Sequence, residues 1–139
     1  MNNSLFTFQI PLEVRDYELD LQGIVNNAVY NHYFEHTRHQ FLKHHELDFA
    51  QLHNEGLDAV VVQMTTKYKR ALKSGDSFVS KLYAVRKGRL RIVFFQSLFL
   101  NPCQSVVASS EVEVACVSNN RPVEPLAIVE KLQITRHFL

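Results

Sequence analysis

One helical stretch enclosed by segments with a strict two-residue alternation is the feature that most limits the fold of this chain. Residues 6–16 alternate apolar and polar side chains, which is typical of a strand with one buried face. From Ala28 to about His44 the apolar residues recur at steps of three and four, which predicts an amphipathic helix. Its apolar stripe consists of Tyr30, Phe34, Thr37 and Phe41.

After Gly56 the alternation returns and continues through most of the chain. Four more strands are expected, over residues 60–70, 77–86, 90–100 and 104–117. Short helical turns are expected over residues 48–55 and 124–132. A strand, a long helix and then an antiparallel meander make an α+β layout. Because the sheet is the only large apolar surface, we expect a curved antiparallel sheet that wraps around the helix.

The length of 139 residues indicates one domain that spans residues 1–139. No apolar run approaches the roughly 18 residues of a membrane span, and the first residues lack the pattern of a signal peptide. Cys103 and Cys116 do not form a disulfide framework, which fits a reducing cytoplasm; Cys116 is expected to be buried. A thin, two-layer domain buries little surface, so a homodimer or homotetramer is expected.

The net charge of +1 hides a strong asymmetry. Residues 1–58 carry nine acidic and three basic side chains, whereas residues 59–91 carry nine basic side chains and Asp76 alone. A concentrated positive block suggests a polyanionic partner, such as a nucleotide-bearing cofactor, a phosphorylated ligand or a nucleic acid. A solvated strand face explains the same charges equally well. Nucleic acid is the weakest of these partners, because the set of aromatic residues among these lysines that could stack on bases is thin, with Tyr68 and Tyr83 as its candidates.

The loop between the first strand and the helix combines an acid with a helix N-terminus. Asp20 and Gly23 precede Asn26 and Asn27, either of which can cap the helix with its side-chain oxygen. The free N–H groups of a first helical turn can hold negative charge that develops on an oxygen. A nearby carboxylate can act as general base or nucleophile, so the pair suits acyl transfer. An aspartate before a glycine turn is also ordinary turn chemistry.

The same residues carry a family resemblance. Asp20-Leu-Gln-Gly23-Ile24-Val25 resembles the Asp-x-x-Gly-Ile/Val-Val element of the 4-hydroxybenzoyl-CoA thioesterase family, whose fold is the hotdog. The continuation to Tyr30 and the residues Tyr33-Phe34-Glu35 and Arg38 resemble its long-chain acyl-CoA thioesterase branch. The similarity extends through the Met64–Ala71 segment to the last long strand.

The resemblance implies roles for individual residues. Asp20 corresponds to the catalytic carboxylate, and the backbone N–H of Asn27 corresponds to the donor that polarises the thioester carbonyl. For the substrate itself, we expect contacts with Gly23, Asn26, Tyr30 and Phe34, at and after the start of the helix. The basic turn that contains Arg86, Lys87 and Arg89 falls where relatives contact the phosphates of CoA; Lys67, Lys69 and Arg70 are further candidates. Asn26 and Asn27 stand where many relatives carry His or Tyr, which leaves the substrate preference open.

The histidines of the predicted helix are a further candidate site. His32, His36 and His39 have a spacing close to that of metal ligands, but no local acid or cysteine completes a set, so we expect no metal and no cofactor. The predicted function is hydrolysis of an acyl-CoA to a free acid and CoA. Two rival functions are a non-catalytic acyl-CoA-binding hotdog domain and a hotdog hydratase or dehydratase. The presence of Asp20 argues against the first, and the lack of a histidine in residues 20–30 argues against the second.

Overall fold

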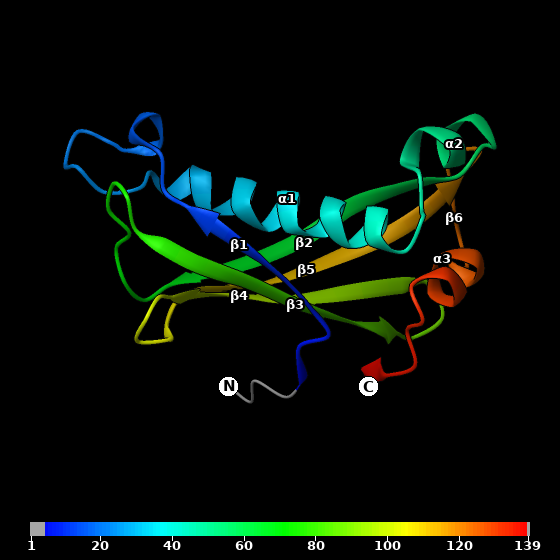
Figure 1. The fold of residues 1–139 in the computed structure, drawn as a ribbon. Helices are drawn as coiled ribbons and strands as arrows, with labels where there is room; N and C mark the ends of the chain where they lie inside the picture. The colour runs from blue at the N-terminus through cyan, green and yellow to red at the C-terminus, as the bar shows by residue number, and fades with distance from the viewer. Residues whose placement is uncertain (1–4, 139) are drawn as a thin grey trace. The chain divides into compact units, whose positions relative to one another are not determined.

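The computed structural model describes residues 5–138 and has the expected α+β composition (Figure 1). The helices are α1 (Asn27–His44), α2 (Phe49–Asn54) and α3 (Leu126–Lys131), with a 3₁₀ turn, η2, at Asp16–Glu18. The strands are β1 (Phe8–Glu13), β2 (Asp58–Tyr68), β3 (Ser77–Lys87), β4 (Arg91–Leu100), β5 (Ser105–Ser118), β6 (Arg121–Val123) and β7 (His137–Phe138). The helices and long strands predicted from periodicity are confirmed; β6 and β7 were not predicted.

The strands form one sheet in the order β1-β3-β4-β5-β2, with β6 paired to β5 and β7 paired to β3. β1 runs antiparallel to β3, from the pair Phe8–Leu82 to the pair Glu13–Ser77. β2 is therefore an edge strand, although it is one of the longest in the sheet.

Residue contacts divide the chain into two compact units. Unit 1 consists of the described residues up to Arg38 together with Thr66–Tyr83 and Phe95–Ser110. Unit 2 consists of His39–Thr65, Ala84–Phe94 and the described residues from Glu111 onward. α1 and the strands β2 to β5 each contribute residues to both units. The expectation of a single domain over residues 1–139 stays a prediction.

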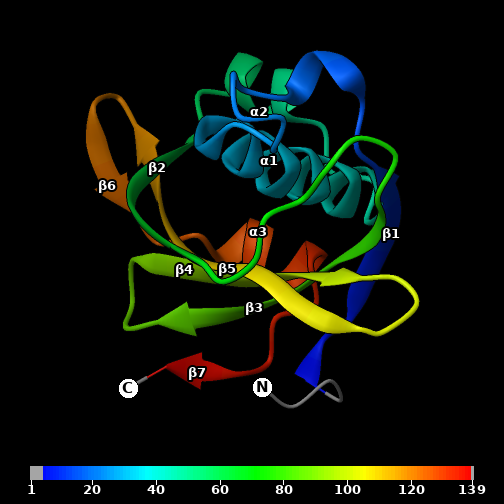
Figure 2. The same cartoon turned by 90° about the vertical axis from the view of Figure 1, so that its left-hand side faces the viewer.

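In unit 1 the first part of α1 packs on one face of the sheet (Figure 2). Tyr33 of α1 lies against Phe78 of β3, with the ring centroids 5.0 Å apart. The core of this unit is formed by Val14, Val25, Tyr30, Tyr33, Phe34, Leu72, Phe78, Leu98, Val107 and Ala108. The expected stripe of α1 is confirmed, since Tyr30, Phe34, Thr37 and Phe41 are all buried.

Buried polar groups also join α1 to the sheet in unit 1. The hydroxyls of Thr37 and Ser80 lie 2.6 Å apart, and both residues are fully buried. Gln96 of β4 donates to the carbonyl oxygen of Phe34 and accepts a hydrogen bond from the Arg38 guanidinium. Burial lowers the pKa of Arg38, and the charge of Glu35 opposes that shift. The network ties the helix to β3 and β4 at one register, because buried polar groups must keep their partners.

Unit 2 holds the end of α1 and the C-terminal elements. Phe41 lies against Phe94 of β4 with ring centroids 6.3 Å apart, and Asp48 caps α2 by accepting a hydrogen bond from the N–H of Ala50. β6 folds back on β5 as a short antiparallel pair, and β7 runs parallel to the end of β3 (Figure 2). Cys116 is buried, as predicted. Within residues 5–138, no helix is long and apolar enough to cross a membrane.

Candidate active site at the start of helix α1

The loop before α1 is closed by its own backbone. Leu19 and Val25 form an isolated antiparallel bridge, and the N–H of Asp20 donates to the carbonyl oxygen of Ile24 at 2.8 Å. The N–H of Gly23 donates back to the carbonyl oxygen of Asp20 at 3.1 Å. Gly23 has a φ of +78°, a left-handed conformation that costs a glycine little. The Asp-x-x-Gly spacing thus produces a tight turn, which holds Asp20 in a defined position.

The two oxygens of the Asp20 carboxylate have different surroundings. Oδ1 accepts hydrogen bonds from the N–H groups of Gln22, at 2.8 Å, and Ile24, at 3.4 Å. Oδ2 makes no hydrogen bond to any residue between 5 and 138. One oxygen therefore orients the half-buried side chain, and the other is available to a water or a substrate.

Asn26 is the N-cap of α1. Its side-chain oxygen accepts a hydrogen bond from the N–H of Ala28 at 2.9 Å, and its own N–H donates to the carbonyl oxygen of Glu18 at 3.0 Å. The N–H of the next residue, Asn27, donates no hydrogen bond within the described residues. An unbonded N–H at the positive end of an 18-residue helix is a suitable donor for an oxyanion.

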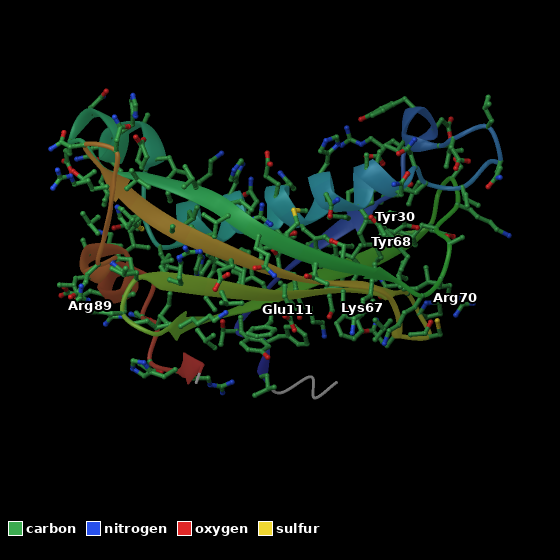
Figure 3. The ribbon with its side chains drawn as sticks, turned by 180° about the vertical axis from the view of Figure 1, so that it is seen from behind. Tyr30, Lys67, Tyr68, Arg70, Arg89 and Glu111 are labelled. Atoms are coloured by element: carbon green, nitrogen blue, oxygen red, sulfur yellow. The ribbon has the colours of Figure 1, made fainter. Side chains whose placement is uncertain are left out.

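The start of α1 is fastened to the chain that follows β2. The hydroxyl of Tyr68 donates to the carbonyl oxygen of Asn27 at 3.1 Å, and the ring centroids of Tyr68 and Tyr30 lie 5.2 Å apart (Figure 3). The hydroxyl of Tyr30 accepts a hydrogen bond from the N–H of Leu72 at 3.1 Å. The N–H of Val25 donates to the carbonyl oxygen of Leu72 at 2.9 Å. These contacts hold the loop after β1 beside the loop after β2 (Figure 1).

Two buried tyrosines lie close to the carboxylates of this loop. Burial raises the pKa of Tyr30, and the charge of Asp20 adds to that shift. Burial also raises the pKa of Tyr33, whose hydroxyl donates to Oε1 of Glu18 at 2.9 Å. Both tyrosines are therefore neutral hydrogen-bonding groups at ordinary pH. Oε1 of Glu18 also accepts a hydrogen bond from the N–H of Arg15, so this carboxylate oxygen stabilises the loop.

The predicted substrate-contacting residues differ in accessibility. Gly23 and Asn26 are exposed, whereas Tyr30 is 4% exposed and Phe34 is fully buried. Phe34 is a residue of α1 and belongs to the core of unit 1. Contact of Tyr30 or Phe34 with an acyl chain stays a prediction.

The predicted CoA-binding turn lies in unit 2 and is rich in ion pairs. Arg86 and Arg89 each pair with Glu124, at 3.4 Å and 3.1 Å. Lys87 pairs with Glu113 at 3.0 Å, and Arg91 approaches the same carboxylate at 3.8 Å. Two glutamates therefore offset much of the positive charge that the sequence concentrates at this turn.

Several residues of these sites were not found by sequence reasoning. Tyr68 and Leu72 reach α1 from 41 and 42 residues away in sequence, and Glu113 and Glu124 reach the basic turn from other strands and loops. The helix histidines His32, His36 and His39 are exposed, and no group of three or more metal-ligating side chains occurs within residues 5–138.

Known proteins resemble this chain over most of its length. The pattern of the Thioesterase-like superfamily matches residues 14–133. The acyl-acyl carrier protein thioesterase ATL3 of Arabidopsis thaliana, a chloroplastic protein, is 35% identical over 133 residues, which are 94% of this chain and 68% of ATL3. The acyl-CoA thioesterase YbgC of Haemophilus influenzae is 28% identical over 135 residues, which are 95% of this chain and 96% of YbgC.

The fold is shared as well. A crystal structure of a hypothetical protein from Aquifex aeolicus superposes with a TM-score of 0.83 and 28% identity, covering 91% of this chain and 99% of that one. The helix-and-sheet arrangement expected from periodicity is accordingly the hotdog fold. With a match that runs from Val14 to Gln133, this chain belongs to the thioesterase-like superfamily.

Proposed function

We propose that this chain is an acyl-CoA thioesterase, which hydrolyses the thioester to a free acid and CoA. The observation that carries the proposal is a pair of groups in one loop that lack hydrogen-bond partners among residues 5–138: Oδ2 of Asp20 and the N–H of Asn27 at a helix N-terminus. Membership of the thioesterase-like superfamily and the near-complete overlap with YbgC support the same reaction.

The thioester carbonyl oxygen accepts a hydrogen bond from the N–H of Asn27. This contact strengthens as the oxygen becomes negative in the tetrahedral intermediate, so it lowers the barrier more than it tightens binding. Asp20 takes a proton from an attacking water, or attacks the carbonyl carbon itself and is then released by water. In both routes the carbon–sulfur bond breaks and the CoA thiol takes up a proton.

An acyl carrier protein is an alternative to CoA as the carrier of the acyl group. The chain is more similar to ATL3, named for acyl-acyl carrier protein substrates, than to YbgC. It covers 68% of ATL3 but 96% of YbgC, and for this reason CoA is the first choice. Both carriers present the acyl group as a thioester of a phosphopantetheine arm, so the chemistry at Asp20 is the same.

The remaining expectations belong to the proposal. Gly23, Asn26, Tyr30 and Phe34 contact the acyl end of the substrate. Contact of Arg86, Lys87 and Arg89 with the CoA phosphates stays a prediction, and the ion pairs of this turn with Glu113 and Glu124 compete with it. The reaction needs no metal or cofactor. A cytoplasmic location fits the cysteines, since Cys103 and Cys116 are both unpaired thiols.

The working enzyme is a homodimer or homotetramer. β2 is an edge strand, and its Val60, Val61 and Val62 are 42%, 48% and 44% exposed. A long apolar edge strand is a template for pairing with another chain, and in a single protomer it would promote aggregation. Pairing of β2 with its copy in a second protomer covers this edge.

A hydrolysis screen tests the proposed function. Release of the free thiol is followed with a panel of aliphatic and aromatic acyl-CoAs and with one acyl carrier protein thioester. The proposal predicts turnover of at least one acyl-CoA that saturates with substrate. Binding of acyl-CoA without thiol release would favour the non-catalytic domain, and hydration of an enoyl substrate would favour the hydratase.

A further inference from the structure

Four cations without ion pairs surround the end of β2 in unit 1. Lys67, Lys69, Arg70 and Lys73 are exposed, and within residues 5–138 no side-chain nitrogen of these four residues has a carboxylate oxygen within 4.0 Å. The backbone N–H of Lys73 donates to Oδ2 of Asp76 at 2.9 Å. We call these four residues the β2-end cations. Figure 3 shows Lys67 and Arg70 on the same stretch of chain as Tyr68.

The basic turn in unit 2 differs from the β2-end cations in its ion pairs. There, Arg86, Lys87, Arg89 and Arg91 share the carboxylates of Glu113 and Glu124. Ion pairs within the chain weaken the field that an incoming anion meets, whereas unpaired cations keep theirs. Of these two basic groups in residues 59–91, the β2-end cations are thus the ones whose side chains have no ion pair among the described residues.

The β2-end cations are attached directly to the proposed catalytic loop. Tyr68, between Lys67 and Lys69, donates to the carbonyl oxygen of Asn27. Lys73 forms an isolated antiparallel bridge with Ile24, whose N–H contacts Asp20. An anion bound by these cations would therefore lie on the segment that holds the oxyanion donor in place.

Arg70 is oriented by its surroundings. Its Nη1 donates to the hydroxyl of Ser105 at 2.8 Å, and its backbone N–H donates to the carbonyl oxygen of Val107 at 3.1 Å. The exposed thiol of Cys103 next to it has a lowered pKa, caused first by its hydrogen bond to Ser105 and also by the charge of Arg70. A guanidinium held by one nitrogen keeps its other N–H groups for phosphate oxygens.

We propose that Lys67, Lys69, Arg70 and Lys73 bind the phosphate groups of the thiol carrier that delivers the acyl group. The inference rests on the proposed thioesterase function and specifies which part of the surface selects the substrate. CoA and a protein-borne phosphopantetheine arm both carry phosphate beyond the pantetheine chain, so the shared chemistry is a phosphate some distance from the thioester. The acyl group itself makes no use of these cations.

Matched substrates and matched variants test the inference. The substrates are one acyl group on CoA, on pantetheine without phosphate, and on an acyl carrier protein. The test variants are Lys67→Gln/Lys69→Gln and Arg70→Gln/Lys73→Gln. Lys87→Gln/Arg89→Gln tests the rival turn, and Lys43→Gln/Lys131→Gln removes two exposed positive charges elsewhere.

The expected result is a rise of about five- to tenfold in KM for acyl-CoA in both test variants, with little change in kcat. Acyl-pantetheine should be hydrolysed equally by the wild type and the test variants, and the Lys43/Lys131 control should match the wild type throughout. A similar rise for the acyl carrier protein thioester would extend the site to both phosphate sources.

Three results would overturn the inference. The first is an equal loss with acyl-pantetheine, which would mean that the substitutions act through the fold. The second is a rise in KM for acyl-CoA in the Lys87/Arg89 variant alone. The third is a loss confined to the acyl carrier protein, which would assign the surface to contact with protein. If the wild type hydrolyses none of the substrates, the proposed function fails first, and calorimetric binding of CoA to the same variants still tests the cations.

Discussion

Asn26 stabilises the start of α1 through one side-chain hydrogen bond, to the N–H of Ala28. We predict that Asn26→Ala lowers the free energy of unfolding by about 1 kcal/mol, as expected for the loss of an N-cap. Asn26→Asp, which keeps a capping oxygen, should lie within a few tenths of a kcal/mol of the wild type. Urea unfolding of the three proteins measures the difference. Equal stability of the Ala and Asp variants would show that the cap is dispensable.

The buried guanidinium of Arg38 depends on Gln96. Arg38 is 8% exposed, and its Nη1 donates to Gln96 Oε1 at 2.9 Å. We predict that Gln96→Leu destabilises the protein by about 2–4 kcal/mol, because it leaves a buried charge without its acceptor. Arg38→Met/Gln96→Leu should recover part of that loss, since it removes the charge as well. A double variant less stable than Gln96→Leu would contradict this account.

Cys116 makes stability sensitive to alkaline pH. Burial raises the pKa of the Cys116 thiol to about 11 from an ordinary 9.0. Because the folded-state value is the higher one, the thiol stabilises the fold fully below about pH 9, and the contribution is lost as pH rises toward 11. We predict that the stability advantage of the wild type over Cys116→Ala shrinks in this window, by up to about 2 kcal/mol. Unfolding curves at pH 8 to 11, both proteins carrying Cys103→Ala, measure it; a constant difference would contradict the prediction.

In a single chain, β2 is an edge strand that exposes apolar side chains, among them Val61. We predict that Val61→Lys, which places a charge on this edge, shifts the protein from an oligomer to a monomer. Leu126→Lys is the matched control, because Leu126 is an exposed apolar residue of α3, at 58%. Light scattering after size-exclusion chromatography gives the mass of each variant. An unchanged mass for Val61→Lys would place the interface elsewhere.

Periodicity predicts elements where one face is buried over many residues. The stripe of α1 and the apolar runs of β3, β4 and β5 satisfy this condition, so their bounds were predicted within about two residues. β6 and β7 have three and two residues, too few to show an alternation. β2 was predicted as a strand, but its exposure on both faces follows from its place at the edge of the sheet, which no local pattern encodes.

The candidate site likewise has a part that local sequence predicts and a part that depends on long-range contacts. Asp20, Gly23 and the capping role of Asn26 are local, so a turn motif followed by a helix start predicts them. Tyr68 and Leu72 contact α1 only because β2 and the chain after it are folded beside the loop, a long-range arrangement. The ion pairs of the basic turn with Glu113 and Glu124 depend on which strands and loops lie beside the turn. The sequence alone therefore predicts unpaired positive charges at this turn, whereas the fold pairs them with two carboxylates.

At the scale of the whole molecule, the central claim is that this chain is a thioesterase in which Asp20 acts at the carbonyl beside the Asn27 N–H. The most suitable variant is Asp20→Asn, because an amide oxygen can still accept from the N–H groups of Gln22 and Ile24. The loop should keep its shape, while the side chain can neither take a proton nor attack as a carboxylate. Circular dichroism and thermal unfolding of the variant should therefore match the wild type.

The most direct measurement is the single-turnover rate of thiol release from a preferred acyl-CoA by the wild type and by Asp20→Asn. We predict a fall of about 10²- to 10⁴-fold in the variant, the range expected for loss of a general base, with acyl-CoA binding retained. A folded Asp20→Asn protein that releases thiol at the wild-type rate would contradict the assignment of Asp20.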